Sequence, residues 1–135
     1  MIIYTATKSQ FTSDVFANQI EQRIMAAFEH RANRKPPPAE IESWRNSMQY
    51  MSNLLLAAQV PDDAGVAIEY GIPLTSKRID FILTGQNANQ QDTGVIVELK
   101  QWSKVSKTDK DGVVSTFVGG GQREQAHPSY QAWTY

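Results

Sequence analysis

Two apolar stretches, Ile79-Asp80-Phe81-Ile82-Leu83 and Val95-Ile96-Val97-Glu98-Leu99-Lys100, decide the fold that this sequence favours. Both are rich in β-branched and aromatic residues, which is typical of buried strands. The polar segment 85–94 between them predicts the tip of a hairpin. A third strand is predicted just before them, where apolar residues alternate over 66–72 until Pro73. We therefore expect a three-stranded meander over 66–72, 78–84 and 95–100.

Helices are predicted on both sides of this meander. Two stripes at helical spacing precede it, and they are formed by Phe16, Ile20, Ile24, Ala27 and Phe28, and by Ile41, Trp44, Met48, Met51 and Leu55. We expect Ser13 or Asp14 to cap the first helix, and Tyr50, Leu54 and Leu56 to make the second buried on more than one side. The rigid segment Lys35-Pro36-Pro37-Pro38 separates them. A last helix is expected to start at His127-Pro128, after a β-like run over 113–118 that Gly119-Gly120-Gly121 interrupts. The fold class is α/β (α+β), with mostly antiparallel strands.

Length and composition limit the possibilities further. A chain of 135 residues predicts a single domain, with an N-terminal helical segment over 1–35 and a core over 40–135. The sequence has no cysteine, which excludes thiolate zinc sites and cysteine nucleophiles and favours a cytoplasmic location. No apolar run approaches the roughly 20 residues that span a bilayer. The net charge of −1 gives no sign of nucleic-acid binding.

Three charged residues stand in the apolar strands. Glu98 and Lys100 are two residues apart and share a strand face, and a hairpin would bring Asp80 beside Glu98. Two adjacent carboxylates repel each other unless a cation joins them, so loss of Glu98 should leave stability unchanged or higher without metal. Oxygen ligands of this kind suit Mg²⁺, and a nearby lysine suits phosphodiester hydrolysis. The alternative is an Asp80–Arg78 ion pair and an exposed Glu98–Lys100 pair.

The order of these residues resembles a known superfamily. Asp80, followed 18 residues later by Glu98-Leu99-Lys100, is similar to the D…(D/E)-x-K signature of the PD-(D/E)XK nucleases. Gln131-Ala132-Trp133-Thr134-Tyr135 resembles the Q-x-x-x-Y motif of the RecB-like branch. Further stretches resemble the N-terminal segments of bacterial proteins that carry a Schlafen-type superfamily-one helicase domain downstream; these are Ile72-Pro73, 75–82, 97–102, 119–121 and 127–133.

The resemblance implies a restriction-endonuclease-like core and a role for each motif residue. Asp80, Glu98 and the Leu99 carbonyl would hold Mg²⁺ or Mn²⁺, and Lys100 would position the attacking water and stabilise charge on the phosphate. Gln131 and Tyr135 would support the site or contact the nucleic-acid backbone. A further acid is expected before or within the meander. Glu42 and Glu69 are the candidates; the first would otherwise lie on a solvated face, and the second would otherwise neutralise Arg78 or Lys77.

The sequence thus predicts a Mg²⁺-dependent nuclease domain acting on nucleic acid, DNA before RNA, in DNA processing or phage defence. The alternative is a catalytically inactive nucleic-acid-binding or docking module. We expect the chain to be an N-terminal part of a longer protein with a helicase domain. The open edge of the third strand is then expected to be covered by another chain, as in a homodimer, or by residues 113–118. Trp102 and Trp133 are expected in the core, with stacking on bases as the alternative. Lys104, Lys107 and Lys110 are expected in solvent, with contacts to phosphates as the alternative.

Overall fold

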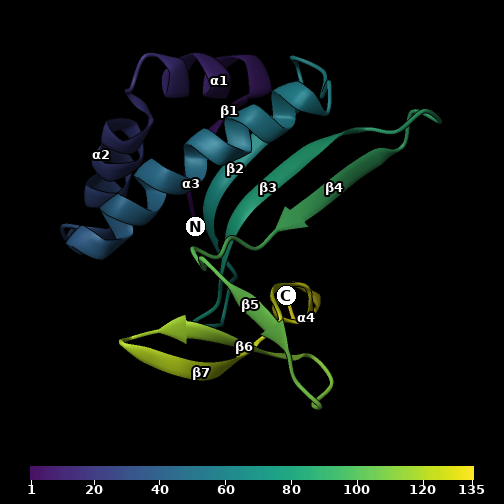
Figure 1. Cartoon of the computed structure of the whole chain (residues 1–135). Helices are drawn as coiled ribbons and strands as arrows, with labels where there is room; N and C mark the ends of the chain where they lie inside the picture. The colour runs from purple at the N-terminus through teal and green to yellow at the C-terminus, as the bar shows by residue number, and fades with distance from the viewer. The chain divides into compact units, whose positions relative to one another are not determined.

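The computed structural model describes all 135 residues, and their contacts divide the chain into two compact units, Met1–Val97 and Glu98–Tyr135. Each unit has one antiparallel sheet, and the chain has four helices in all (Figure 1). The mixed α+β class predicted from the sequence is therefore confirmed. None of the four helices is both long and apolar enough to cross a membrane.

The N-terminal unit is a four-stranded meander with three helices. Its strands follow the order β1-β2-β3-β4, and its elements are β1 (Ile2–Thr7), α1 (Lys8–Phe16), α2 (Ile20–Ala32), α3 (Pro38–Ala57), β2 (Gly65–Gly71), β3 (Arg78–Gln86) and β4 (Asp92–Val97). The expected meander of three strands is wrong, because β1 adds a fourth strand beside β2. The expectation that residues 1–35 are helical is wrong for the same strand, which lies within them. Strand β1 has only six residues and pairs with β2, more than 50 residues away, so local pattern alone gave little sign of it.

The hydrophobic core lies where α1, α2 and α3 gather against the sheet (Figure 1). Phe11 of α1 meets Phe81 of β3 edge to face, with ring centroids 5.5 Å apart. Ile79 and Phe81 are buried, whereas Asp80 between them is partly exposed. The period of two expected for this strand is therefore confirmed, and it sets Asp80 on the side away from the Phe81 ring.

The first helical stripe belongs to two helices. Thr7 caps α1, since its hydroxyl oxygen accepts a hydrogen bond from the backbone N–H of Gln10 at 3.2 Å. The expected caps, Ser13 and Asp14, are wrong because both lie inside α1. Phe16, the last residue of α1, is 89% exposed because the chain turns away after it and α2 starts afresh at Ile20.

The second stripe is confirmed, but its helix is less buried than expected. Trp44, Met48, Met51 and Leu55 are all buried on α3. The three residues beside the stripe, Tyr50, Leu54 and Leu56, are exposed instead. Only one face of α3 packs on the unit, as an amphipathic surface helix does.

The hairpin predicted from residues 78–84 and 95–100 is present as β3 and β4, with shifted boundaries. Phe81 pairs with Val97, and the paired strands run out to Gln86 and Asp92. The third strand ends at Val97, so the expectation that it continues to Lys100 is wrong. Glu98, Leu99 and Lys100 are outside any strand and begin the second unit.

The C-terminal unit is a three-stranded sheet and one short helix. Its strands follow the order β5-β6-β7, with β5 at Val105–Lys107, β6 at Val113–Val118 and β7 at Gly121–Ala126, and α4 covers Pro128–Trp133. Gly119 and Gly120 both have positive φ and form the tight turn that folds β7 back on β6. The prediction that 113–118 covers the edge of the third strand is therefore wrong. Residues 113–118 form β6, which pairs with β5 and β7 instead.

Candidate metal and phosphodiester site

Three side chains of the C-terminal unit converge on the Glu98 carboxylate. Lys100 Nζ lies 2.7 Å from Glu98 Oε1, and Gln131 Nε2 donates to the same oxygen at 2.5 Å. The Tyr135 hydroxyl donates to Glu98 Oε2 at 2.7 Å. The Glu98 side chain is only 4% exposed, so these donors, rather than water, hold its charge.

The helix α4 explains why Gln131 reaches Glu98. His127 caps this helix, because its Nδ1 accepts a hydrogen bond from the backbone N–H of Ser129 at 3.1 Å. The expectation that the last helix starts at His127-Pro128 is confirmed. Gln131 Nε2 also donates to the Tyr135 hydroxyl at 2.8 Å, so the two motif residues form one chain of hydrogen bonds ending on Glu98. Gln131 and Tyr135 follow Glu98 by 33 and 37 residues in the sequence, yet both bind its carboxylate.

The hydrogen bonds to Glu98 do not use all of its acceptor sites. A carboxylate offers about four lone-pair sites, two on each oxygen. Oε1 accepts from Lys100 and Gln131, whereas Oε2 accepts only from Tyr135. By this count one lone-pair site on Oε2 receives no hydrogen bond, and carboxylates that bind metals are commonly held by hydrogen bonds such as these. The donor set fits an oxygen-seeking ion such as Mg²⁺.

Asp80 belongs to the N-terminal unit and lies in an acidic neighbourhood there. Glu69 of β2 and Asp80 of β3 lie between the paired couples Ile68–Phe81 and Tyr70–Ile79 of the β2–β3 ladder. Glu69 has a positive φ of 58°, which is uncommon for a residue with a side chain. Trp44 Nε1 donates to Glu69 Oε1 at 2.8 Å, and Arg78 forms an ion pair with the same carboxylate.

The Glu69 carboxyl is electrostatically unusual. Its side chain is buried, and this burial raises the pKa of Glu69 above the ordinary value. The hydrogen bond from Trp44 and the charge of Arg78 lower this pKa, whereas the negative charges of Asp80 and Glu40 raise it further. Strained backbone and a perturbed carboxyl are features that gather at functional sites.

The structure separates the two candidates for an assisting acid. Glu69 neutralises Arg78, as one of the two interpretations expected, and lies close enough to Asp80 for the charge of Asp80 to act on it. Glu42 contacts Arg45 at 3.1 Å and Asn46 at 3.3 Å on the exposed side of α3, so its solvated-face interpretation is confirmed. Arg78 forms ion pairs with Glu40 and Glu69.

Sequence reasoning missed Glu40, which binds Arg78 at 3.2 Å. Glu40 stands four residues before Trp44, so the two share a helical face, and Trp44 was already expected to face the core. That spacing was the signal that could have found it. Trp133 was expected in the core and is 87% exposed. It is the last residue of a six-residue helix, where little of the unit is left to cover it.

No protein-family model, curated protein or solved structure matches the chain. No group of three or more His, Cys, Asp or Glu side chains is arranged to hold a metal ion. The expected set at Glu98 relies on fewer acids, together with a backbone carbonyl and water, as Mg²⁺ sites commonly do.

Proposed function

We propose that the chain is a metal-dependent nuclease domain with a restriction-endonuclease-like core, which hydrolyses phosphodiester bonds with Mg²⁺ or Mn²⁺. The observation that carries this proposal is the Glu98 carboxylate, on which Lys100, Gln131 and Tyr135 all converge. An exposed, solvated ion pair would need only Lys100. Three donors, one two residues after Glu98 and two from α4 and the chain just beyond it, hold Glu98 in one rotamer, and pre-positioned ligands are what a metal site requires.

Asp80 is proposed as the second carboxylate ligand and the Leu99 carbonyl as the third oxygen. Asp80 precedes Phe81 in β3, and Glu98 follows Val97, the β4 partner of Phe81. When bound, the metal would supply a Lewis acid for the phosphate and a water of lowered pKa.

The other side chains have roles that follow from their chemistry. Lys100 would stabilise the charge that builds on the phosphate oxygens, because its ammonium lies at the carboxylate that would hold the ion. Gln131 and Tyr135 are positioning residues, since they touch Glu98 rather than the reacting atoms. The substrate is nucleic acid, with DNA as the first candidate, acted on in DNA processing or phage defence by a protein that also carries a helicase.

The test combines metal binding and cleavage. Labelled single- and double-stranded DNA and RNA are incubated with Mg²⁺ or Mn²⁺, and thermal unfolding is measured with and without Mn²⁺. We expect cleavage by the wild type, an upward shift of its Tm with Mn²⁺, and loss of both in Asp80→Asn and Glu98→Gln. Asp92→Asn is the matched control, because Asp92 is an exposed carboxylate at the far end of the same hairpin.

Cleavage that persists in Asp80→Asn and Glu98→Gln would overturn the assignment of the site. Nucleic-acid binding by the wild type without cleavage or any Mn²⁺ shift would instead favour the inactive binding module. The Mn²⁺ shift of the wild type is measured independently of the variants, so poor folding of Glu98→Gln does not obscure the result.

A further inference from the structure

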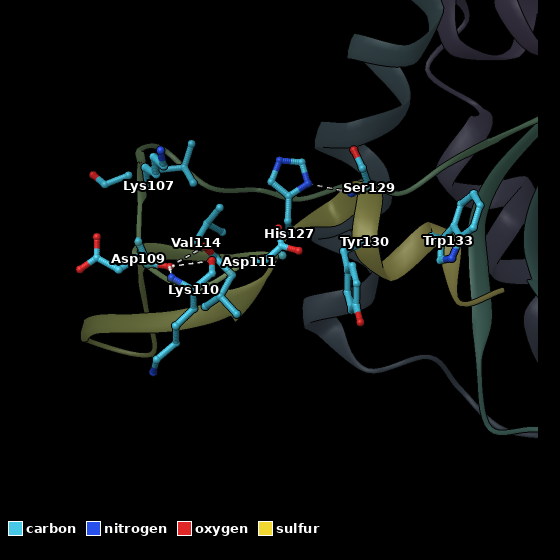
Figure 2. A pocket seen from close by; sticks show the side chains of 14 residues that line it. Lys107, Asp109, Lys110, Asp111, Val114, His127, Ser129, Tyr130 and Trp133 are labelled. Carbon is cyan, nitrogen blue, oxygen red and sulfur yellow. Dashed lines mark hydrogen bonds between the residues drawn. The ribbon is translucent and has the colours of Figure 1, made fainter.

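The C-terminal unit contains a cavity of about 1000 Å³ that the Glu98 site does not use. One wall is formed by β5 and the segment leading into β6, over residues 105–114, and the other by α4 and its cap (Figure 2). Both walls belong to the same unit. Its volume is at the upper end of the range of roughly 300–1000 Å³ that is common for small-ligand pockets. A molecule the size of one or two nucleotides would fit such a space.

Two aromatic residues of α4 line this cavity. Tyr130 and Trp133 are three residues apart on the helix, and both line the cavity (Figure 2). They are 57% and 87% exposed, respectively. Gln131, which holds Glu98, projects from α4 at roughly 100° to Tyr130 by helix geometry. The same short helix therefore presents aromatic surface to the cavity and a hydrogen-bond donor to the proposed metal ligand.

Tyr130 is held in place by a neighbour without a side chain. A Cβ at Gly112 would lie 3.0 Å from the Tyr130 ring, and Gly112 has a positive φ of 66°. The backbone N–H of His127 also donates to the Gly112 carbonyl at 2.8 Å. The ring of Tyr130 thus rests on the backbone of the loop, which fixes one side of the cavity.

The polar lining selects among ligands. Lys107 is exposed and makes no ion pair, whereas the Lys110 ammonium binds Glu124 at 2.6 Å. Asp109 and Asp111 also line the cavity, and Glu124 already neutralises Lys110, so the lining keeps two aspartates and one lysine without an ion pair. A polyphosphate would therefore meet an excess of negative charge here. One phosphate beside Lys107 and one base against the aromatic rings would be accommodated.

His127 adds a second donor. Its Nδ1 accepts from the backbone of Ser129, so in the neutral ring Nε2 carries the proton and can donate to a ligand. Aromatic rings that stack on bases, together with a few donors for the backbone, are the usual elements of single-strand binding.

We propose that this cavity receives an unpaired nucleotide of a single-stranded nucleic acid. In this arrangement its base stacks on Trp133 and Tyr130, and its phosphate contacts Lys107. The inference rests on the proposed function, since it assigns single-stranded ends or gaps as the substrate of the Glu98 site. It adds a substrate-binding element that the motif residues do not provide.

The experiment measures binding without cleavage. Fluorescence anisotropy in EDTA follows labelled single-stranded and blunt duplex oligonucleotides, with the full chain as wild type, Trp133→Ala and Lys107→Ala. The control is Tyr50→Ala, because Tyr50 is an aromatic residue of α3 that is 76% exposed and belongs to the N-terminal unit. Trp133 is so exposed that its removal should leave the fold intact.

We expect the single strand to bind more tightly than the duplex. Trp133→Ala should weaken single-strand binding roughly 5- to 150-fold, the range for loss of one base–aromatic stack. Lys107→Ala should weaken it less and reduce its salt dependence, and Tyr50→Ala should bind as the wild type does. Equal affinity of Trp133→Ala and wild type, or equal affinity for single strand and duplex, would overturn the proposal.

Failure of this inference can be told from failure of the nuclease proposal. If the wild type cuts nucleic acid but Trp133→Ala binds normally, the cavity assignment is wrong and the Glu98 site stands. If Trp133→Ala loses binding while no metal-dependent cleavage is found, the cavity binds nucleic acid and the nuclease proposal falls. Competition by a free nucleoside monophosphate that matches the oligonucleotide in affinity would show a mononucleotide site and overturn the strand-binding proposal.

Discussion

The replacement Glu98→Gln tests how far the C-terminal unit depends on its central carboxylate. From sequence, removal of one of two repelling acids should leave stability unchanged or higher. The contacts argue the opposite, because Lys100, Gln131 and Tyr135 all donate to Glu98. Glutamine keeps one acceptor oxygen and places an NH₂ group where the other oxygen was. At least one donor would then face a donor.

The cost can be worked from these bonds. A hydrogen bond to a charged group contributes about 1.5–3 kcal/mol, and stranding its buried partner costs a similar amount. Glu98→Gln loses one such bond and weakens two, so we expect the unit Glu98–Tyr135 to lose about 2–4 kcal/mol. Since each 1.4 kcal/mol is a factor of ten, amide hydrogen exchange within that unit should speed up roughly 30- to 700-fold.

Hydrogen exchange read by mass spectrometry resolves the two units. Peptides from residues 98–135 should lose protection, while peptides from the core strands of 1–97 should keep theirs. Glu124→Gln is the control, because Glu124 pairs with Lys110 on the exposed side of the same unit and should contribute less than about 1 kcal/mol. Protection in 98–135 that is the same in both variants would refute the reasoning that Glu98 is a structural centre of this unit.

Three further predictions concern the fold and its electrostatics. Burial raises the folded-state pKa of Glu69, so the folded state binds that proton more tightly than the unfolded state does. The stability of the wild type relative to Glu69→Gln should therefore fall as pH rises from about 4.5. A difference in urea unfolding that does not change with pH would contradict this. Phe81→Ala should cost about 3–5 kcal/mol in urea unfolding because Phe81 is fully buried, whereas exposed Phe16→Ala should change stability by less than about 0.5 kcal/mol. Gly112→Ala should destabilise residues 98–135 by about 1–3 kcal/mol, because the new Cβ would stand at a positive φ and collide with the Tyr130 ring. Faster hydrogen exchange in these residues is the expected readout. Unchanged exchange would show that the loop moves to accommodate the methyl group.

Local patterns predicted much of the N-terminal unit. The alternation in β2 and β3 and the stripe on α3 each follow from a periodicity of two or 3.6, and each requires only residues close together in sequence. The same holds for the cap at His127 and the break at Gly119 and Gly120. The same patterns predicted the ends of the helices and strands less well. Phe16 fitted a helical stripe, yet one apolar residue cannot show that a helix has ended.

The sequence by itself determined the α+β class, the Asp80-bearing strand and the spacing of Gln131 and Tyr135, because side-chain periodicity and motif spacing are local properties. Only the tertiary structure decided that β1 joins β2, that β4 stops at Val97, and that β6 pairs with β5 and β7. It also decided which donors meet at Glu98 and that Trp133 is exposed. These outcomes depend on contacts between residues tens of positions apart. Each such pairing competes with many others of similar local pattern, and one pairing is selected only when the whole unit packs.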